Sequence, residues 1–149
     1  MADMLVNLYR LPNRDDGIFK QNGIVIKRVL PPDKSKVLSF ICSEFKQSWA
    51  DECEHAFSHD PIGCYIAVRD GEILGFACYD ATAKGYFGPT GVKQTERRQG
   101  IGAALLRACL NSMREIGYGY AIIGWAAEKA IPLYQREAGA CLLYTSRCV

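Results

Sequence analysis

One stretch of the sequence, residues 85–117, limits the fold more than any other, because it joins a short strand, a basic loop and a long helix. From Gly100 to about Gly117 the apolar residues recur at helical spacing. One face of this helix is apolar or small, and it comprises Ile101, Leu105, Ala108, Cys109, Ser112 and Ile116. Gly117 ends the helix, and Tyr118 to Trp125 follows with the composition of a buried strand. This order predicts an α/β arrangement in which the helix packs on a sheet.

The composition fits one folded domain over residues 1–149. Apolar residues make up 49% and charged residues 23% of the chain, and a chain of this length can bury a core. No apolar run reaches the roughly 20 residues of a membrane span, and the N-terminus carries an acid where a signal peptide has bases. We therefore expect a cytoplasmic protein with no membrane partner. Seven cysteines, mostly in apolar contexts, favour buried thiols over disulfides.

The charge pattern argues against a nucleic-acid partner. The net charge is +2, and the basic residues are scattered apart from the cluster between Lys93 and Arg98. A duplex footprint needs a stripe of phosphate contacts, and this cluster is too small to supply one. It has the right size for one small anionic ligand.

Short strands and helices are expected in the rest of the chain. The predicted strands are residues 4–10, 23–30, 64–69, 72–79, 85–92, 118–125 and 141–147. The predicted helices run from Asp33 to about Phe45, from Trp49 to His59, from Gly100 to Gly117 and from Ala130 to Glu137. This order implies a mixed α/β fold whose central sheet is partly antiparallel, partly parallel and flanked by helices.

Two dipeptides refine this picture. Asp70-Gly71 lies between two strand-like runs, and an Asp-Gly pair there predicts a tight hairpin, since both turn residues need positive φ. Gly88-Pro89 is awkward inside a sheet. It predicts a bulge, or an edge at which the strand separates from its neighbour.

The start of the long helix has the properties of an anion site. The first turn of a helix leaves backbone N–H groups unpaired, and its dipole is positive at that end. Gly100 and Gly102 remove Cβ atoms that would keep a phosphate away, and Arg97 and Arg98 add forked donors. A Walker-type loop is absent, and Leu105 replaces the third glycine of a dinucleotide fingerprint.

The segment Arg97-Arg98-Gln99-Gly100-Ile101-Gly102 matches the motif Gln/Arg-x-x-Gly-x-Gly/Ala. In this motif and in the order of its elements, from about Gly23 to Val149, the chain resembles the GNAT superfamily of N-acetyltransferases. The resemblance implies a GNAT-like acyl-CoA N-acyltransferase fold in a single domain, with acetyl-CoA as co-substrate and no metal. The cofactor-binding residues it implies are Gly91, Val92, Lys93, Arg97, Arg98, Gln99, Gly100, Ile101, Gly102 and Ala103.

The resemblance also implies a mechanism. The strands at Tyr86–Lys93 and Tyr120–Trp125 would splay apart around the pantetheine arm, and the Val92 N–H would polarise the thioester carbonyl. Tyr134 is the expected catalytic residue, a general acid for the departing thiolate; packing under the cofactor is its alternative role. The chain departs from the family pattern at two places. Ala127 stands where many members carry Asn, so one polar contact is missing or is replaced by Glu128, and Gly139-Ala140 replaces Gly-Phe.

The sequence constrains the acceptor of the acetyl group less than it constrains the donor. We expect the primary amine of a small molecule, attacked directly in a ternary complex; a non-catalytic acetyl-CoA-binding module and a protein lysine acetyltransferase are the alternatives. The candidate general bases are Asp51, Glu52, Glu54, His55 and Asp80, with a water chain as another route. The aromatic residues expected around a small substrate are Trp49, Phe57 and Tyr65.

Two further hypotheses follow from particular residues. A zinc site could use Cys53, His55, His59 and Cys64, but their spacing matches no known finger, so we expect no metal. The strand from Met4 to Arg10 and the apolar C-terminal strand leave a homodimer open.

Overall fold

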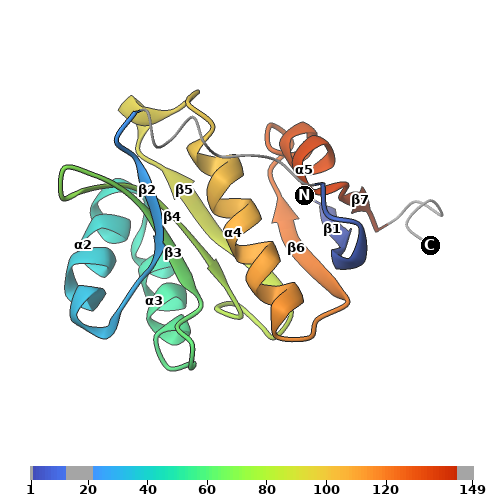
Figure 1. The fold of residues 1–149 in the computed structure, drawn as a ribbon, viewed down its shortest axis with the longest axis horizontal. Coiled ribbons are helices and arrows are strands. Elements are labelled where there is room, and N and C mark those ends of the chain that lie inside the picture. The colour runs from blue at the N-terminus through green and yellow to red at the C-terminus, as the bar shows by residue number, and fades with distance from the viewer. Residues whose placement is uncertain (1, 13–21, 144–149) are drawn as a thin grey trace.

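Seven strands form one mixed sheet in the computed structural model, which describes residues 2–12 and 22–143 (Figure 1). The strands are β1 (Ala2–Asn7), β2 (Val25–Arg28), β3 (Cys64–Arg69), β4 (Glu72–Tyr79), β5 (Tyr86–Val92), β6 (Tyr120–Ala126) and β7 (Cys141–Leu142). Their order is β2-β3-β4-β5-β6-β1-β7, and only the pair β5–β6 is parallel. The mixed sheet expected from the sequence is confirmed.

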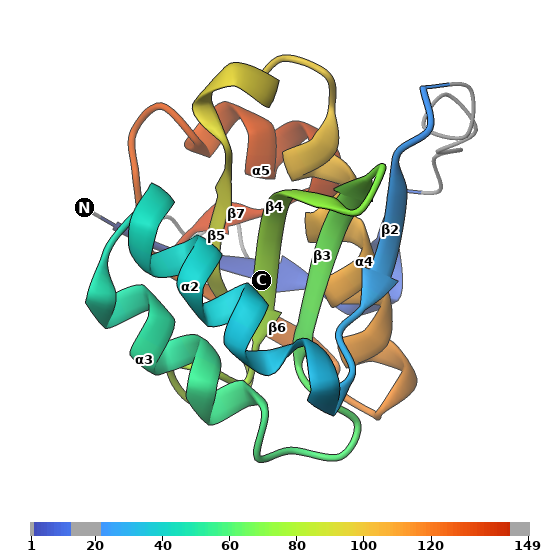
Figure 2. The ribbon, with the colours of Figure 1, turned by 90° about the vertical axis from the view of Figure 1, so that its left-hand side faces the viewer.

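Helices cover both faces of this sheet. They are α2 (Lys34–Glu44), α3 (Gln47–Ala56), α4 (Ile101–Glu115) and α5 (Ile131–Ala138), with short 3₁₀ turns η1 (Leu8–Arg10), η2 (Pro31–Asp33) and η3 (Gln94–Glu96). Helices α2 and α3 lie side by side on one face, and α4 lies on the other (Figure 2). The described chain is thus a single α/β domain with two apolar layers, one under each face.

Local sequence signals account for the central elements. Asp70 and Gly71 both adopt positive φ, 51° and 77°, as a tight β3–β4 hairpin requires. Along α4 the side chains of Leu105, Leu110 and Met113 are fully buried against the sheet. Burying one such side chain stabilises the fold by about 1.5–3 kcal/mol. The apolar face of α4 therefore holds this helix against β3, β4 and β5.

The N-terminal segment differs from its prediction. The strand expected over residues 4–10 is β1, which ends at Asn7, and residues 8–10 form η1. The Asn7 side chain accepts a hydrogen bond from the Tyr9 N–H at 3.0 Å, which caps this turn and ends the strand. Strand β1 also lies inside the sheet, antiparallel to both β6 and β7.

Other boundaries shift by a few residues. Strand β2 is shorter than the predicted 23–30, and α3 begins and ends earlier than the predicted 49–59. Of the C-terminal strand predicted over 141–147, residues 141–142 form β7, and residues 144–147 lie outside the described part of the chain. Free thiols occur at Cys42, Cys53, Cys64, Cys78 and Cys109, of which only Cys42 is exposed.

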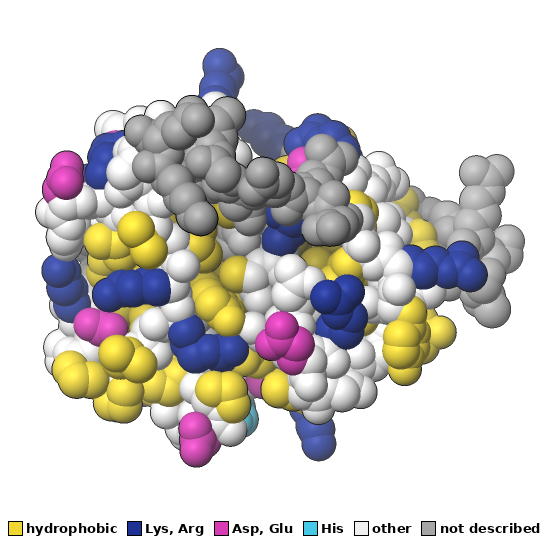
Figure 3. All heavy atoms as spheres, in the orientation of Figure 1, with side chains coloured by type: hydrophobic (Ala, Val, Ile, Leu, Met, Phe, Trp, Pro, Cys, Tyr) yellow, Lys and Arg dark blue, Asp and Glu magenta, His cyan; other side chains and the backbone are white. Residues whose placement is uncertain are grey.

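The surface is mixed in character. On the face shown in Figure 3, Lys and Arg side chains are separated by apolar and uncharged surface, and they form no continuous stripe among the described residues. Within the described ranges, every helix is too short or too polar to cross a membrane.

Candidate active site

The parallel strands β5 and β6 separate partway along their length. They pair only through Tyr86 with Ile122 and Phe87 with Ile123. Beyond Phe87, Gly88 adopts a φ of 115° and Pro89 has no N–H to donate, so the ladder stops there. The separation predicted from Gly88-Pro89 is therefore observed.

A cleft of about 1240 Å³ occupies this opening. Its walls are β5 from Gly88 to Val92 and the β6 segment from Ile123 to Ala127. The first turn of α4, parts of α5 and the start of α3 complete it, so the cleft runs from the basic loop to Glu52 of α3. The surface of the cleft is mainly apolar and also carries charged and polar side chains, as is typical of a small-molecule site.

The amide of Val92 faces this cleft. The Lys93 N–H donates to the Leu74 carbonyl of β4 at 2.8 Å. In an antiparallel ladder successive residues turn their N–H groups to opposite sides, so Val92 points away from β4, toward the gap beside β6. The same alternation turns Gly91 back toward β4. Of the expected cofactor-binding positions Gly91, Val92 and Lys93, Val92 thus presents its N–H to the cleft.

The basic loop before α4 places the N-terminus of this helix at the opening of the cleft. Arg98 and Gly100 both adopt left-handed conformations, with φ of 68° and 82°. The first helical bond runs from the Ala104 N–H to the Gly100 carbonyl at 3.1 Å. The N–H groups of Ile101, Gly102 and Ala103 therefore precede the helical ladder and, as in any first helical turn, are donors for an anion.

Arginine side chains add charge at this mouth. Arg97 and Arg98 are exposed and line the cleft, and the Arg97 Nε donates to the Val92 carbonyl at 3.3 Å. A Cβ at Gly102 would lie 3.6 Å from Val92 Cγ2, an ordinary contact, so Gly102 does not crowd the strand. Unpaired amides, helix dipole and two guanidinium groups fit a pyrophosphate.

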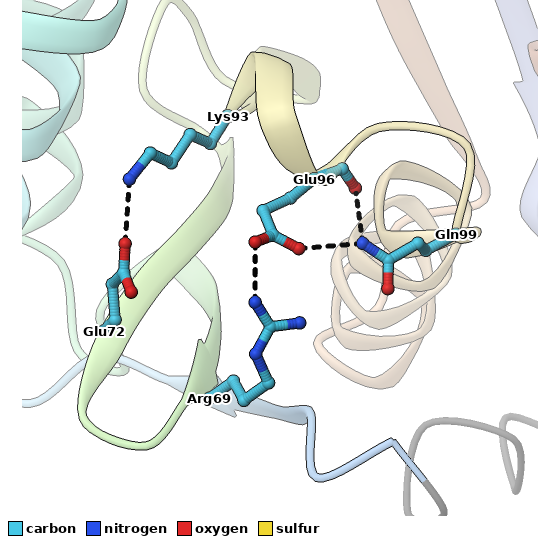
Figure 4. A network of polar contacts seen from close by, with 5 residues as sticks. All are labelled: Arg69, Glu72, Lys93, Glu96 and Gln99. Carbon is cyan, nitrogen blue, oxygen red and sulfur yellow. Dashed lines mark hydrogen bonds and ion pairs between the residues drawn. The ribbon is translucent and has the colours of Figure 1, made fainter.

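A network of polar contacts holds the loop before α4 in place (Figure 4). Glu96 accepts a hydrogen bond from Arg69 Nη2 at 2.6 Å and another from Gln99 Nε2 at 2.8 Å. Lys93 forms a separate ion pair with Glu72 at 2.8 Å. Gln99 thus supports the loop through Glu96, and neither Gln99 nor Lys93 lines the cleft. The Arg69–Glu96 contact was missed from sequence, because nothing local links residues that are 27 apart.

Tyr134 lies on α5 and lines the same cleft. Its side chain is 8% exposed, and its ring meets that of Phe87 edge-on at 6.3 Å between centroids. Burial raises the pKa of the Tyr134 phenol above its ordinary value of 10.0, so it stays protonated at neutral pH. A buried, protonated hydroxyl in the cleft is suited to proton donation. Ala127 lines the cleft as well, whereas Glu128 does not.

Among the expected bases, Glu52 alone lines the cleft. Asp51 accepts from Gln47, and Glu54 pairs with Lys34 at 3.2 Å on the surface. The Asp80 carboxylate accepts from the Tyr118 hydroxyl and from the Gly85 N–H. The His55 Nδ1 lies 2.7 Å from the Ala81 carbonyl.

Asp3, which sequence reasoning missed, also lines the cleft, and its carboxylate accepts a hydrogen bond from the Trp125 N–H at 2.9 Å.

The expected aromatic wall is only partly present. Trp49 lines the cleft, but Phe57 and Tyr65 do not. Phe57 packs in the layer of α2 and α3. The Tyr65 hydroxyl contacts Arg28 and Ser112 on the opposite face of the sheet, because alternate β3 side chains point to opposite faces. Tyr86, from β5, lines the cleft in their place.

The four residues of the zinc hypothesis do not converge on one point. The Sγ atoms of Cys53 and Cys64 lie 3.7 Å apart, but the third group beside them is Cys78. His59 Nε2 lies 3.0 Å from the Asp80 carbonyl oxygen, and His55 Nδ1 lies beside the Ala81 carbonyl oxygen. The Cys₂His₂ arrangement is therefore wrong.

Residues 34–140 match the family model described as Acetyltransferase (GNAT) family. Since this match covers more than half of the chain, the protein belongs to the GNAT family of acetyltransferases. No curated protein matches the chain in sequence.

Solved structures share the fold at low identity. The GCN5-related glucosamine N-acetyltransferase region of a fungal multi-domain GH3 β-N-acetylglucosaminidase has 15% identity and a TM-score of 0.76, covering 95% of this chain and 19% of that one. A Brucella melitensis GNAT acetyltransferase in complex with acetyl-CoA has 18% identity and a TM-score of 0.58, covering 74% and 80%. An aminoglycoside acetyltransferase from an uncultured soil metagenomic sample, in complex with sisomicin, has 17% identity and a TM-score of 0.59, covering 78% and 88%. This chain thus spans about a fifth of the first of these proteins.

Proposed function

We propose that this protein transfers the acetyl group of acetyl-CoA to the primary amine of a small molecule, with both substrates bound together. The observation that carries the proposal is the content of one cleft: the Val92 N–H, the first-turn amides of α4 and the Tyr134 hydroxyl. Family membership and the acetyl-CoA bound to a structural neighbour support the identity of the donor.

Each group has a separate task in this proposal. Ile101, Gly102 and Ala103 would hold the pyrophosphate through their N–H groups, with Arg97 and Arg98 adding charge. Acetyl-CoA supplies an activated acetyl carbon. The Val92 N–H would donate to the thioester oxygen, where negative charge develops during attack. Tyr134 would give its proton to the departing sulfur.

The acceptor amine must lose a proton before it attacks, since its pKa in water is near 10. Glu52 is the candidate base, because it is the one expected acid at the cleft and, among the described residues, its carboxylate accepts a hydrogen bond only from Thr82 Oγ1, at 3.2 Å. Asp3 would hold an ammonium group of the acceptor from the other wall. These two cleft-lining carboxylates, Glu52 and Asp3, favour a cationic small amine.

Two alternatives remain distinguishable from this proposal. A non-catalytic module would bind acetyl-CoA in the same cleft without turnover. A protein lysine acetyltransferase would acetylate peptides in preference to free amines. The aminoglycoside acetyltransferase and the agmatine N-acetyltransferase among the structural neighbours support a small amine as acceptor. The proposal places the protein in the cytoplasm on sequence grounds alone, and it leaves a homodimer open.

A thermal-shift screen would test the acceptor class. Amines, amino sugars and lysine peptides are added to the protein in the presence of CoA, and each hit is then incubated with acetyl-CoA. The proposal expects small cationic amines to stabilise the CoA-bound protein and to be acetylated. Stabilisation without any product would support the binding module, and acetylation of peptides alone would support the lysine acetyltransferase.

A further inference from the structure

Three cysteine side chains meet in the apolar layer under α3. Cys53 comes from α3, Cys64 from β3 and Cys78 from β4, where Cys64 and Cys78 are cross-strand partners. All three are fully buried, and their Sγ atoms lie within 4.8 Å of one another. Figure 2 shows α3 beside α2 on one face of the sheet to which β3 and β4 belong. The active-site cleft does not include these residues.

The sulfur triangle has the dimensions of a three-coordinate thiolate site. A three-coordinate ion bonded to sulfur at about 2.3 Å requires sulfurs about 3.5 Å apart in pyramidal geometry and about 4.0 Å apart in planar geometry. The Cys53–Cys64 separation is 3.7 Å, and the upper limit for every pair is 4.8 Å, so this spacing is reached by small side-chain adjustments. Two strands and a helix hold the three Cα positions, which keeps the triangle from collapsing.

The net charge of the complex decides which ion the buried three-cysteine site can hold. Three thiolates give a net charge of −1 with Zn²⁺ and −2 with Cu⁺, and a buried net charge is costly among apolar side chains. Zn²⁺ also requires a fourth ligand, and no other metal-binding side chain joins these three among the described residues. A trivalent ion gives a neutral complex with three ligands.

We propose that Cys53, Cys64 and Cys78 form a binding site for trivalent arsenic or its heavier congener antimony. Arsenous acid is a neutral molecule, and it would exchange its three hydroxyl groups for three sulfurs: As(OH)₃ + 3 Cys–SH → As(S–Cys)₃ + 3 H₂O. Each S–H proton leaves with one hydroxyl group as water. Arsenic stays trivalent, so the reaction needs no oxidant or reductant and no charge enters the core.

Occupancy would also affect the catalytic cleft. The ion would fix α3 to β3 and β4, and α3 carries Trp49 and Glu52 at the acceptor end of that cleft. The site itself does not depend on the proposed acetyl transfer, so the two proposals succeed or fail separately.

The test is thermal unfolding of the whole protein, reduced with a phosphine, in the presence and absence of arsenous acid. At a hundredfold excess over Kd we expect the Tm to rise by roughly 8 °C, and one arsenic per chain to remain after desalting. Cys53→Ala and Cys78→Ala should abolish both effects. Cys109→Ala is the matched control, because Cys109 is equally buried but lies on α4, outside the triangle.

Several results would overturn the proposal. They are an unchanged Tm, a shift that persists in Cys53→Ala, and stoichiometric retention of Zn²⁺ in preference to arsenic. X-ray absorption of the arsenic-loaded wild-type protein gives a readout that needs no variant. Three As–S bonds and no As–O bond would support the site, and fewer than three sulfurs would contradict it.

Discussion

Arg69 Nη2 lies 2.6 Å from Glu96 Oε1, and this ion pair joins the end of β3 to the turn in front of α4 (Figure 4). The same carboxylate accepts from Gln99, which directly precedes the left-handed Gly100. The conformation of the cofactor loop thus depends on a strand that does not itself reach the cleft. We therefore expect the Arg69–Glu96 ion pair to contribute to the affinity for acetyl-CoA.

Replacing Glu96 should therefore weaken acetyl-CoA binding. In Glu96→Gln the charge that holds Arg69 is lost, and we expect the Kd for acetyl-CoA to rise on the order of fivefold, because the amides of α4 are less well oriented. Calorimetric titration measures this. Glu72→Gln is the control, since Glu72 pairs with Lys93 on the same side of the protein but does not touch Gln99. Equal Kd values for the two variants would refute a role for Glu96 in orienting the loop.

The same ion pair gives a pH dependence of stability. Hydrogen bonds from Arg69, and then from Gln99, hold the pKa of Glu96 below its ordinary value of 4.5. A carboxyl group with a lowered pKa stabilises the fold above its unfolded pKa and loses that contribution as the pH falls through its folded pKa. The difference in Tm between wild type and Glu96→Gln should be constant from about pH 8 to pH 5 and shrink below about pH 4.5. A difference that grows in acid would contradict this assignment.

Tyr134→Phe tests the proposed general acid. Removing the hydroxyl should lower kcat about 100-fold and leave the Kd for acetyl-CoA unchanged, because the ring still packs on Phe87. Since burial raises the pKa of Tyr134 above 10.0, its ionisation should cause no fall in kcat below that pH. Tyr118→Phe removes a hydroxyl bonded to Asp80 outside the cleft and should keep full kcat. A Tyr134→Phe variant with wild-type kcat would leave this residue a packing role.

Glu52→Gln tests the proposed base. We expect kcat/KM for the amine to fall roughly tenfold to 100-fold, with little change in Tm, because Glu52 lines the cleft and, in the described part of the chain, forms a side-chain hydrogen bond only with Thr82. Glu54→Gln, two residues further along α3 and paired with Lys34, is the control and should behave as wild type. If both variants retain full activity, deprotonation proceeds through another route.

Gly91→Ala and Gly102→Ala should differ in stability. A Cβ at Gly91 would lie 2.5 Å from ring atoms of Phe45, so we expect a loss of about 1–3 kcal/mol in the free energy of unfolding. A Cβ at Gly102 meets only Val92 Cγ2 at 3.6 Å, and alanine favours a helix by up to about 1 kcal/mol over glycine. Urea denaturation compares them. Equal destabilisation would show that the contact with Phe45 is not the cause.

The sequence predicted the features that local signals encode. Asp70-Gly71 identified the hairpin, Gly88-Pro89 the separation of strands, and the loop before Ile101 the start of α4. Sequence did not predict the position of β1 between β6 and β7, because that pairing joins opposite ends of the chain. It also misplaced Tyr65, since alternation along β3 assigns a side chain to a face only once the partner layers are known.

Acetyl transfer itself is the most direct test of the central claim. Wild-type protein is incubated with isotopically labelled acetyl-CoA and the amine that most stabilises its CoA-bound form, and mass spectrometry follows both products. The account predicts a labelled N-acetyl amine formed in equal amount to free CoA, and about 100-fold more slowly with Tyr134→Phe. Acetyl-CoA that binds in the cleft but is recovered intact, with no acetylated amine from any tested acceptor, would contradict it.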